Sequence, residues 1–75
     1  MNLTELKIVK HPFSGAYRFL VTVGGWKLAG NAPSKDQAFD AVQVFVSEHG
    51  DEEAREFLRR VVSPVLDLRD EVVYP

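Results

Sequence analysis

The sequence predicts an α+β domain in which a three-stranded antiparallel sheet carries two helices on one face, in β-β-β-α-α order. Three observations predict this fold class. Two runs rich in β-branched and aromatic residues flank the pair Gly24-Gly25, a serine-led amphipathic helix follows, and a second capped helix comes next. The C-terminal tail could add a short fourth strand. Seventy-five residues make one domain, placed at residues 1–75.

The first strand is expected at Leu6–Lys10, where apolar and polar residues alternate. The next five residues break this alternation and are expected to form a turn. Pro12 removes a backbone donor and holds His11 in an extended conformation, and Gly15 gives the chain the freedom to turn back.

The second and third strands are expected to form a hairpin closed at Gly24-Gly25, because both glycines can adopt the positive φ angles of a two-residue turn. The resulting register pairs Val23 with Trp26, Val21 with Leu28, and Phe19 with Gly30. We expect these residues to share the core face, which would bury both aromatic rings. The opposite face, expected to be solvated, carries Arg18, Leu20, Thr22, Lys27 and Ala29.

Gly30 to Pro33 is expected to be a loop that leads into the first helix. Ser34 and Gln37 fit the capping-box pattern at the start of that helix. Its apolar stripe consists of Ala38, Ala41, Val42 and Phe45. Gly50 suits the stop position after His49.

Asp51 can cap a second helix directly, and the acidic residues after it favour the positive end of the helix dipole. Pro64 is expected to end this helix. Its apolar stripe consists of Ala54, Phe57, Leu58 and Val61. In the tail, Leu66 and Leu68 could form the fourth strand on a sheet edge, or the segment could wrap the helices as an extended arm.

The composition of the chain limits the functional classes to which it can belong. The chain has no cysteine, so a disulfide or a thiolate metal site is not available. Its longest apolar runs, such as Phe19-Leu20-Val21, are far shorter than the ~20 residues of a membrane span, and its first residues do not resemble a signal peptide. We therefore expect a cytoplasmic protein without membrane association. The net charge of −2 divides into a basic strand half and an acidic helical half.

Residues that could carry catalysis are sparse. The two histidines, His11 and His49, lie far apart in the sequence and form no metal-binding motif. The serines occupy turn or helix positions, and the glycines do not match a phosphate-binding loop. We expect no enzymatic activity, no metal and no cofactor.

The segment from Phe19 to Val42 resembles the last hairpin and final helix of double-stranded RNA-binding domains. The likeness covers about a third of the chain. It implies phosphate contacts from the start of the helix, where Lys35 stands. The first helix of that family is missing, and Asp36 and Asp40 stand near Lys35, which opposes the positive charge that phosphate binding requires. We attribute the match to a shared β-β-α arrangement, and we do not assign the chain to this family.

Three surfaces are candidate binding sites. The first is an acidic corner, formed by Glu48, Asp51, Glu52 and Glu53. The second is the tail segment of Val72, Val73 and Tyr74, which could add a strand to a sheet edge. The third, a nucleic-acid surface, would use the basic residues Lys7, Arg18, Lys27 and Lys35.

The composition favours a small protein-binding module over an enzyme. We expect a stand-alone inhibitor or regulator that occupies a surface of a larger protein assembly, such as one that handles nucleic acid, through the acidic corner or the tail. The alternative is a nucleic-acid-binding module that uses the basic open face of the sheet. The sequence leaves the identity of the protein partner open, and the chain could be a monomer or a homodimer.

Overall fold

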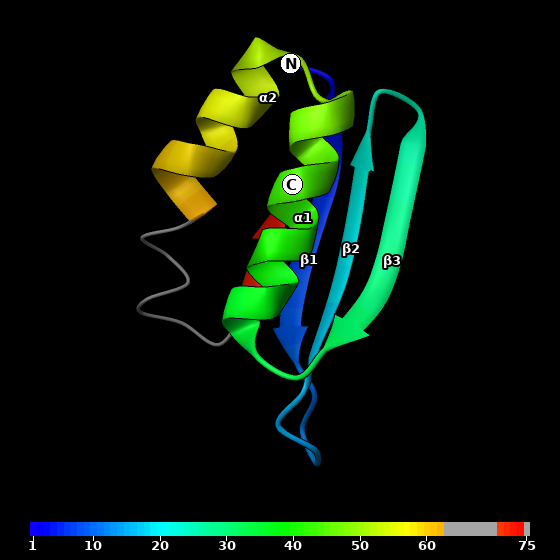
Figure 1. Cartoon of the computed structure of the whole chain (residues 1–75), viewed down its shortest axis with the longest axis vertical. Helices are drawn as coiled ribbons and strands as arrows, with labels where there is room; N and C mark the ends of the chain where they lie inside the picture. The colour runs from blue at the N-terminus through cyan, green and yellow to red at the C-terminus, as the bar shows by residue number, and fades with distance from the viewer. Residues whose placement is uncertain (63–70, 75) are drawn as a thin grey trace.

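A computed structural model of the chain describes residues 1–62 and 71–74 and confirms the α+β fold class. Figure 1 shows a sheet with two helical segments on one of its faces. The strands are β1 (Leu3–Lys10), β2 (Tyr17–Val23), β3 (Trp26–Ala32) and β4 (Glu71–Tyr74). The helices are α1 (Lys35–His49) and α2 (Glu52–Phe57), and α2 continues into a π-helical turn at Leu58–Val62.

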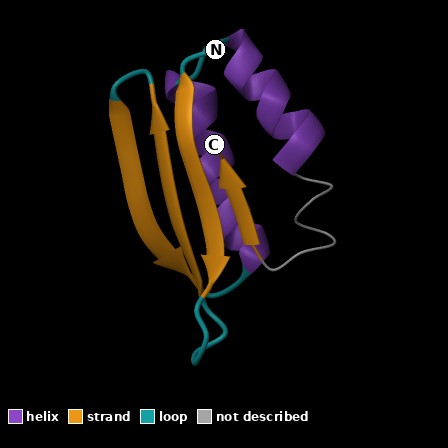
Figure 2. Ribbon diagram, turned by 180° about the vertical axis from the view of Figure 1, so that it is seen from behind, coloured by secondary structure: helices purple, strands orange, loops and turns teal. Residues whose placement is uncertain are grey.

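The four strands are antiparallel and lie in the order β3-β2-β1-β4, as Figure 2 shows from the side opposite the helices. The predicted hairpin register is confirmed, with Val23 opposite Trp26 and Phe19 opposite Gly30. Gly24 and Gly25 adopt φ angles of 57° and 82°, as a turn of this kind requires. The first strand is longer than expected, because Leu3 also pairs with β2 across an irregularity before Glu5. The third strand continues to Ala32, so that of the residues expected to form a loop only Pro33 lies outside it.

The predicted helix caps are confirmed. The Ser34 hydroxyl accepts a hydrogen bond from the Gln37 N–H, and the Asp51 carboxylate accepts one from the Ala54 N–H. Gly50 ends α1, but with an ordinary φ of −80°. Glycine is needed there for space, because a Cβ would lie 2.6 Å from the Val46 carbonyl oxygen.

The fourth strand forms at Glu71–Tyr74 and pairs with β1. Leu66 and Leu68, which the sequence suggests for this strand, lie outside the described residues. Val72 stands opposite Ile8, and Tyr74 opposite Leu6. The expected short fourth strand is thus present, on the edge beside β1.

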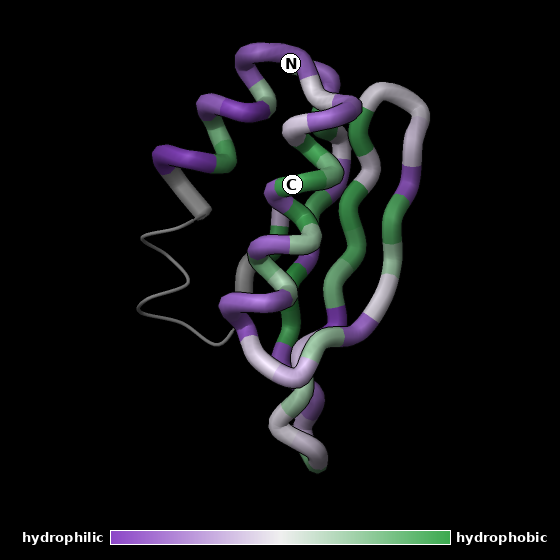
Figure 3. The backbone as a smooth tube through the Cα atoms, viewed as in Figure 1, coloured by the Kyte–Doolittle hydropathy of each residue, from purple (hydrophilic) through white to green (hydrophobic). Residues whose placement is uncertain are grey.

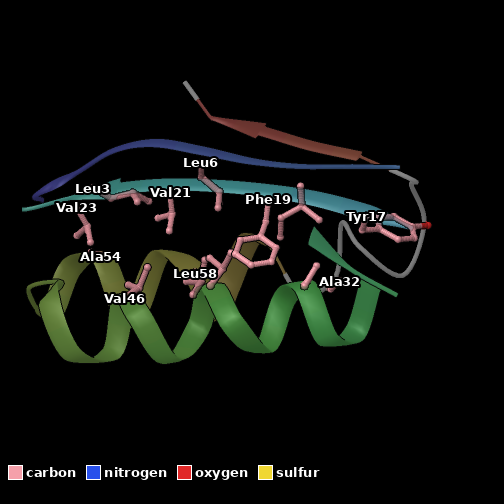
Figure 4. Close-up of a cluster of buried hydrophobic side chains, with 13 residues drawn as sticks. Leu3, Leu6, Tyr17, Phe19, Val21, Val23, Ala32, Val46, Ala54 and Leu58 are labelled. Carbon is pink, nitrogen blue, oxygen red and sulfur yellow. The ribbon is translucent and has the colours of Figure 1, made fainter. Parts of the chain in front are cut away.

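The core lies between the sheet and the helices. Figure 4 shows side chains from the strands pointing toward α1 and α2, with the Phe19 ring between the layers. In Figure 3, hydrophobic residues run along the strands, and hydrophilic ones mark the outer turns of the helices. The buried residues are Leu3, Leu6, Ile8, Tyr17, Phe19, Val21, Val23, Ala32, Ala38, Val42, Val46, Ala54 and Leu58.

The predicted burial of Trp26 is wrong. Its side chain lies on the predicted face, opposite Val23, but is 58% exposed. Because β3 is an edge strand and Trp26 stands at its first position, the core does not surround the ring. Instead the ring stacks on His49 at 4.5 Å between centroids, and His49 in turn contacts Phe45.

Candidate functional site

The acidic corner is a structural junction more than a free surface. Asp51 caps α2, and its carboxylate lies 3.7 Å from the Met1 ammonium. The hydrogen bond from the Ala54 N–H lowers the pKa of Asp51, and the charge of the Met1 ammonium acts in the same direction. Glu53 also lies 3.7 Å from this ammonium. Part of the negative charge of the corner is therefore paired with the Met1 ammonium and holds the N-terminus against α2.

Asn2 connects three elements at this corner, a role that sequence reasoning missed. Its side-chain amide donates to the His49 carbonyl oxygen at 3.1 Å and accepts from the Asp51 N–H at 2.9 Å. Its own carbonyl oxygen accepts from the Gly24 N–H at 2.9 Å. The hairpin turn, the end of α1 and the start of α2 are therefore joined through one residue. No local pattern around Asn2 signals these contacts, because the partners lie more than 20 positions away.

The other two acidic residues, Glu48 and Glu52, are exposed on different helices. Glu48 lies 3.9 Å from the His49 ring nitrogen on α1. Glu52 is exposed on the first turn of α2, and the described residues provide no cation within 4 Å of it. The four acids predicted to act together are thus divided between a cap, an N-terminal ion pair and separate exposed positions.

The tail segment belongs to the sheet. Tyr74 packs against the core, and its ring lies 4.7 Å from that of Phe57 between centroids. Val73 precedes Tyr74 in the strand, so its side chain lies on the opposite face of the sheet. There it pairs with Lys7 and is 54% exposed. Only Val73 of the predicted tail site therefore has a described side chain available to a partner.

The face of the sheet turned away from the helices, here called the open face, is covered by no described element (Figure 2). The register places Lys7, Arg18 and Lys27 on it together, as the sequence predicts. Lys35 does not join them, because it begins α1 in the other layer. The predicted basic set is therefore reduced to three members.

Cross-strand partners form rows on the open face. The middle row runs from β3 to β4 through Ala29, Leu20, Lys7 and Val73. Three of these four are apolar, and the aliphatic stem of the lysine can continue the row. A shallow hollow beside the row is lined by Arg18, Phe19, Leu20, Ala29, Gly30 and Asn31.

The charges on the open face are partly unpaired. Lys7 lies 4.0 Å from Glu5, which also accepts a hydrogen bond of 3.5 Å from the Thr22 hydroxyl. Among the described residues, no carboxylate lies within 4 Å of Arg18 or Lys27. The face thus presents an apolar row, and on each side of it stands a cation that has no ion-pair partner among the described residues.

The structure brings together no group suited to hold a metal within residues 1–62 and 71–74. His11 and His49 stand at opposite ends of the sheet, since one follows the Lys10–Tyr17 end and the other contacts the Trp26 end. The His11 ring nitrogen accepts from the Phe13 N–H at 3.3 Å, a contact that shapes the turn. Within the described part of the chain, none of the helices has the length and apolarity needed to cross a membrane.

Comparisons with protein-family models, with curated proteins and with solved structures find no match to this sequence or fold.

Proposed function

We propose that this chain is a non-enzymatic protein-binding module, acting as an inhibitor or regulator, and that its protein partner docks on the open face of the sheet. The observation that carries the proposal is the apolar middle row between Arg18 and Lys27, on a face that the described helices leave uncovered. This surface includes Val73 of the tail segment that the sequence favours, but not the acidic corner.

The composition of the open face suits a protein surface. Leu20 and Val73 supply apolar area that gains free energy when water is removed from it. Arg18 and Lys27 are exposed and lack a described ion-pair partner, so each can pair with a carboxylate of another protein. We therefore infer a partner surface with an apolar centre and acidic flanks.

The acidic corner supports the proposal less well. The Asp51 carboxylate is engaged by the Ala54 N–H and the Met1 ammonium, so a partner would compete with contacts that hold the fold together. Glu52 and Glu53 are exposed and could still add contacts at the rim of an interface. Such exposed pairs contribute little to affinity, about 0–1 kcal/mol each.

Nucleic-acid binding is the second candidate, favoured by the grouping of Lys7, Arg18 and Lys27 on one face. Sheets that read RNA stack bases on exposed aromatic rings. The described residues of the open face include no aromatic ring, and Trp26 lies on the opposite face. Glu5 also places negative charge among the cations. A protein partner therefore fits this face better.

The proposal is tested with a matched pair of substitutions that each replace an apolar residue by glutamate. Leu20→Glu changes the middle row, where Lys7 stands next to the new carboxylate. Val44→Glu makes the same change on α1, at a side chain that is 58% exposed and lies in the other layer. Circular dichroism first establishes that both variants fold.

Each variant is then used to capture proteins from the native host, and the captured protein is purified and titrated by calorimetry. We expect Leu20→Glu to weaken binding by about tenfold or more, while Val44→Glu binds like the wild type. Equal binding by all three proteins would rule out the open face. Salt-sensitive binding of duplex or single-stranded probes, abolished by Arg18→Glu, would instead establish the nucleic-acid function.

A further inference from the structure

The strand β3 forms a long edge of the sheet that no described strand covers, and Lys27 is its one charged residue. It pairs with β2 on one side, and no described strand lies on its other side. It has seven residues, and it contains neither proline nor an irregularity in its pairing. The opposite edge, β4, has only four residues. Proteins usually shorten, bend or block an exposed edge because its free N–H and C=O groups invite another strand.

The hairpin geometry identifies which groups on this edge are free. In a hairpin with a two-residue turn, the closing pair exchanges two hydrogen bonds, and bonded pairs then alternate along the ladder. Val23 and Trp26 close this hairpin, so Leu28 and Gly30 also direct their backbone groups to β2. The N–H and C=O groups that point outward belong to Lys27, Ala29 and Asn31.

We propose that a second copy of this chain occupies this edge, with the two β3 strands antiparallel and a two-fold axis at Ala29. This register uses every outward-pointing group, because Ala29 bonds with Ala29 of the second copy and Lys27 bonds with Asn31. The sheet then continues through eight strands. An isologous contact of this kind closes on itself, so assembly stops at the dimer.

Side-chain sizes are complementary in this register. On the helix side, Leu28 opposes Gly30 of the second copy. Glycine is needed there because the Phe19 ring of the same chain lies over it, and a Cβ on Gly30 would be 2.8 Å from that ring. Leu28 of the second copy would therefore lie beside the Phe19 ring, which is 7% exposed in the single chain. Trp26 opposes Ala32 in the same way, so a large side chain faces a small one at each position.

The charges and the exposed apolar area also suit a second copy. Lys27 opposes the neutral Asn31, which keeps the two lysines at opposite ends of the interface. The contact would cover part of the Trp26 ring, which is 58% exposed and touches His49 on one side. Large exposed aromatic rings of this kind are typical of interfaces.

The test is the mass of the purified chain in solution, measured by sedimentation equilibrium from about 1 µM to 1 mM, because a three-residue ladder predicts modest affinity. We expect a mass that rises from 8.4 kDa to twice that value and then stays constant. A mass of 8.4 kDa at every concentration would overturn the proposal. That result is expected if the edge binds an extended segment of another protein instead. Growth beyond the dimer would overturn the proposal as well.

Two substitutions locate the contact. Ala29→Pro removes an N–H that points outward, so β3 keeps its pairing with β2. Ala29→Lys places two like charges opposite each other on the axis. We expect both variants to be folded monomers, while Gln43→Lys, which adds the same charge on α1, still dimerises. Dimers that survive both Ala29 substitutions would place the contact elsewhere and contradict the proposal.

Discussion

The two faces of the sheet differ in what holds their side chains in place. On the helix side, Leu6 and Val21 are fully buried and packed against α1 and α2. On the open face, the neighbouring positions Lys7 and Leu20 face solvent or lie only partly covered. The same strands thus carry a stabilising surface and an accessible one, because successive side chains alternate between faces. We conclude that substitutions on the two faces should separate stability from binding.

The sharpest comparison makes the same change on both faces. Leu6→Ala removes a fully buried side chain and should lower the free energy of unfolding by about 2–5 kcal/mol. Leu20→Ala removes a partly exposed one and should cost less than about 1 kcal/mol. Urea denaturation measures both values. Similar losses for the two variants would show that the open face also holds the fold together. If Leu6→Ala does not fold at all, Leu6→Val supplies a milder comparison, with a smaller expected loss.

The second comparison uses the two asparagines. Asn2→Ala removes both side-chain hydrogen bonds that join α1 and α2 to the N-terminus, and should cost about 1–2 kcal/mol. Asn31→Ala alters the open face and should cost less than about 0.5 kcal/mol. Thermal unfolding at high dilution, which favours the monomer, measures the difference. An Asn2→Ala protein as stable as the wild type would mean that the junction contributes nothing to stability.

The smallest effect concerns the pH dependence of the junction. Folding lowers the pKa of Asp51, so the stability that its charge provides is full above the unfolded value of about 3.9. This stability is lost as the pH falls through the lowered value of the folded state. The stability difference between the wild type and Asp51→Asn should therefore shrink below about pH 4.

Ser34→Ala is the control for this pH dependence. It removes the cap of α1 without removing an ionisable group, so its cost should be the same at every pH. A wild-type advantage over Asp51→Asn that persists unchanged at low pH would contradict the role given to the carboxylate.

The sequence predicts the parts of the fold that depend on local patterns. The glycines at 24 and 25 define the hairpin register, and Ser34 and Asp51 mark the helix starts, because turns and caps are set by neighbouring residues. The short fourth strand expected from the tail is present at Glu71–Tyr74. The residues first expected to form it, Leu66 and Leu68, lie outside the described part of the chain, so their place stays a prediction.

The candidate site depends on contacts that local patterns do not show. The alternation along β2 places Arg18 and Leu20 on the open face, and this expectation is confirmed. The exposure of Trp26 follows from the position of β3 at the edge of the sheet, which the order of the strands decides. The engagement of Asp51 by the N-terminus likewise depends on how distant segments meet.

The most direct test of the division between the two faces is methyl NMR of the chain titrated with its purified partner. We predict that the methyl signals of Leu20, Val73 and Val9, which pairs with Arg18 on the open face, shift on binding. The signals of Leu6 and Ile8, buried on the helix side, should stay in place. Shifts confined to methyl groups of α1 and α2, such as those of Val44, would contradict the account and move the binding surface to the helical layer.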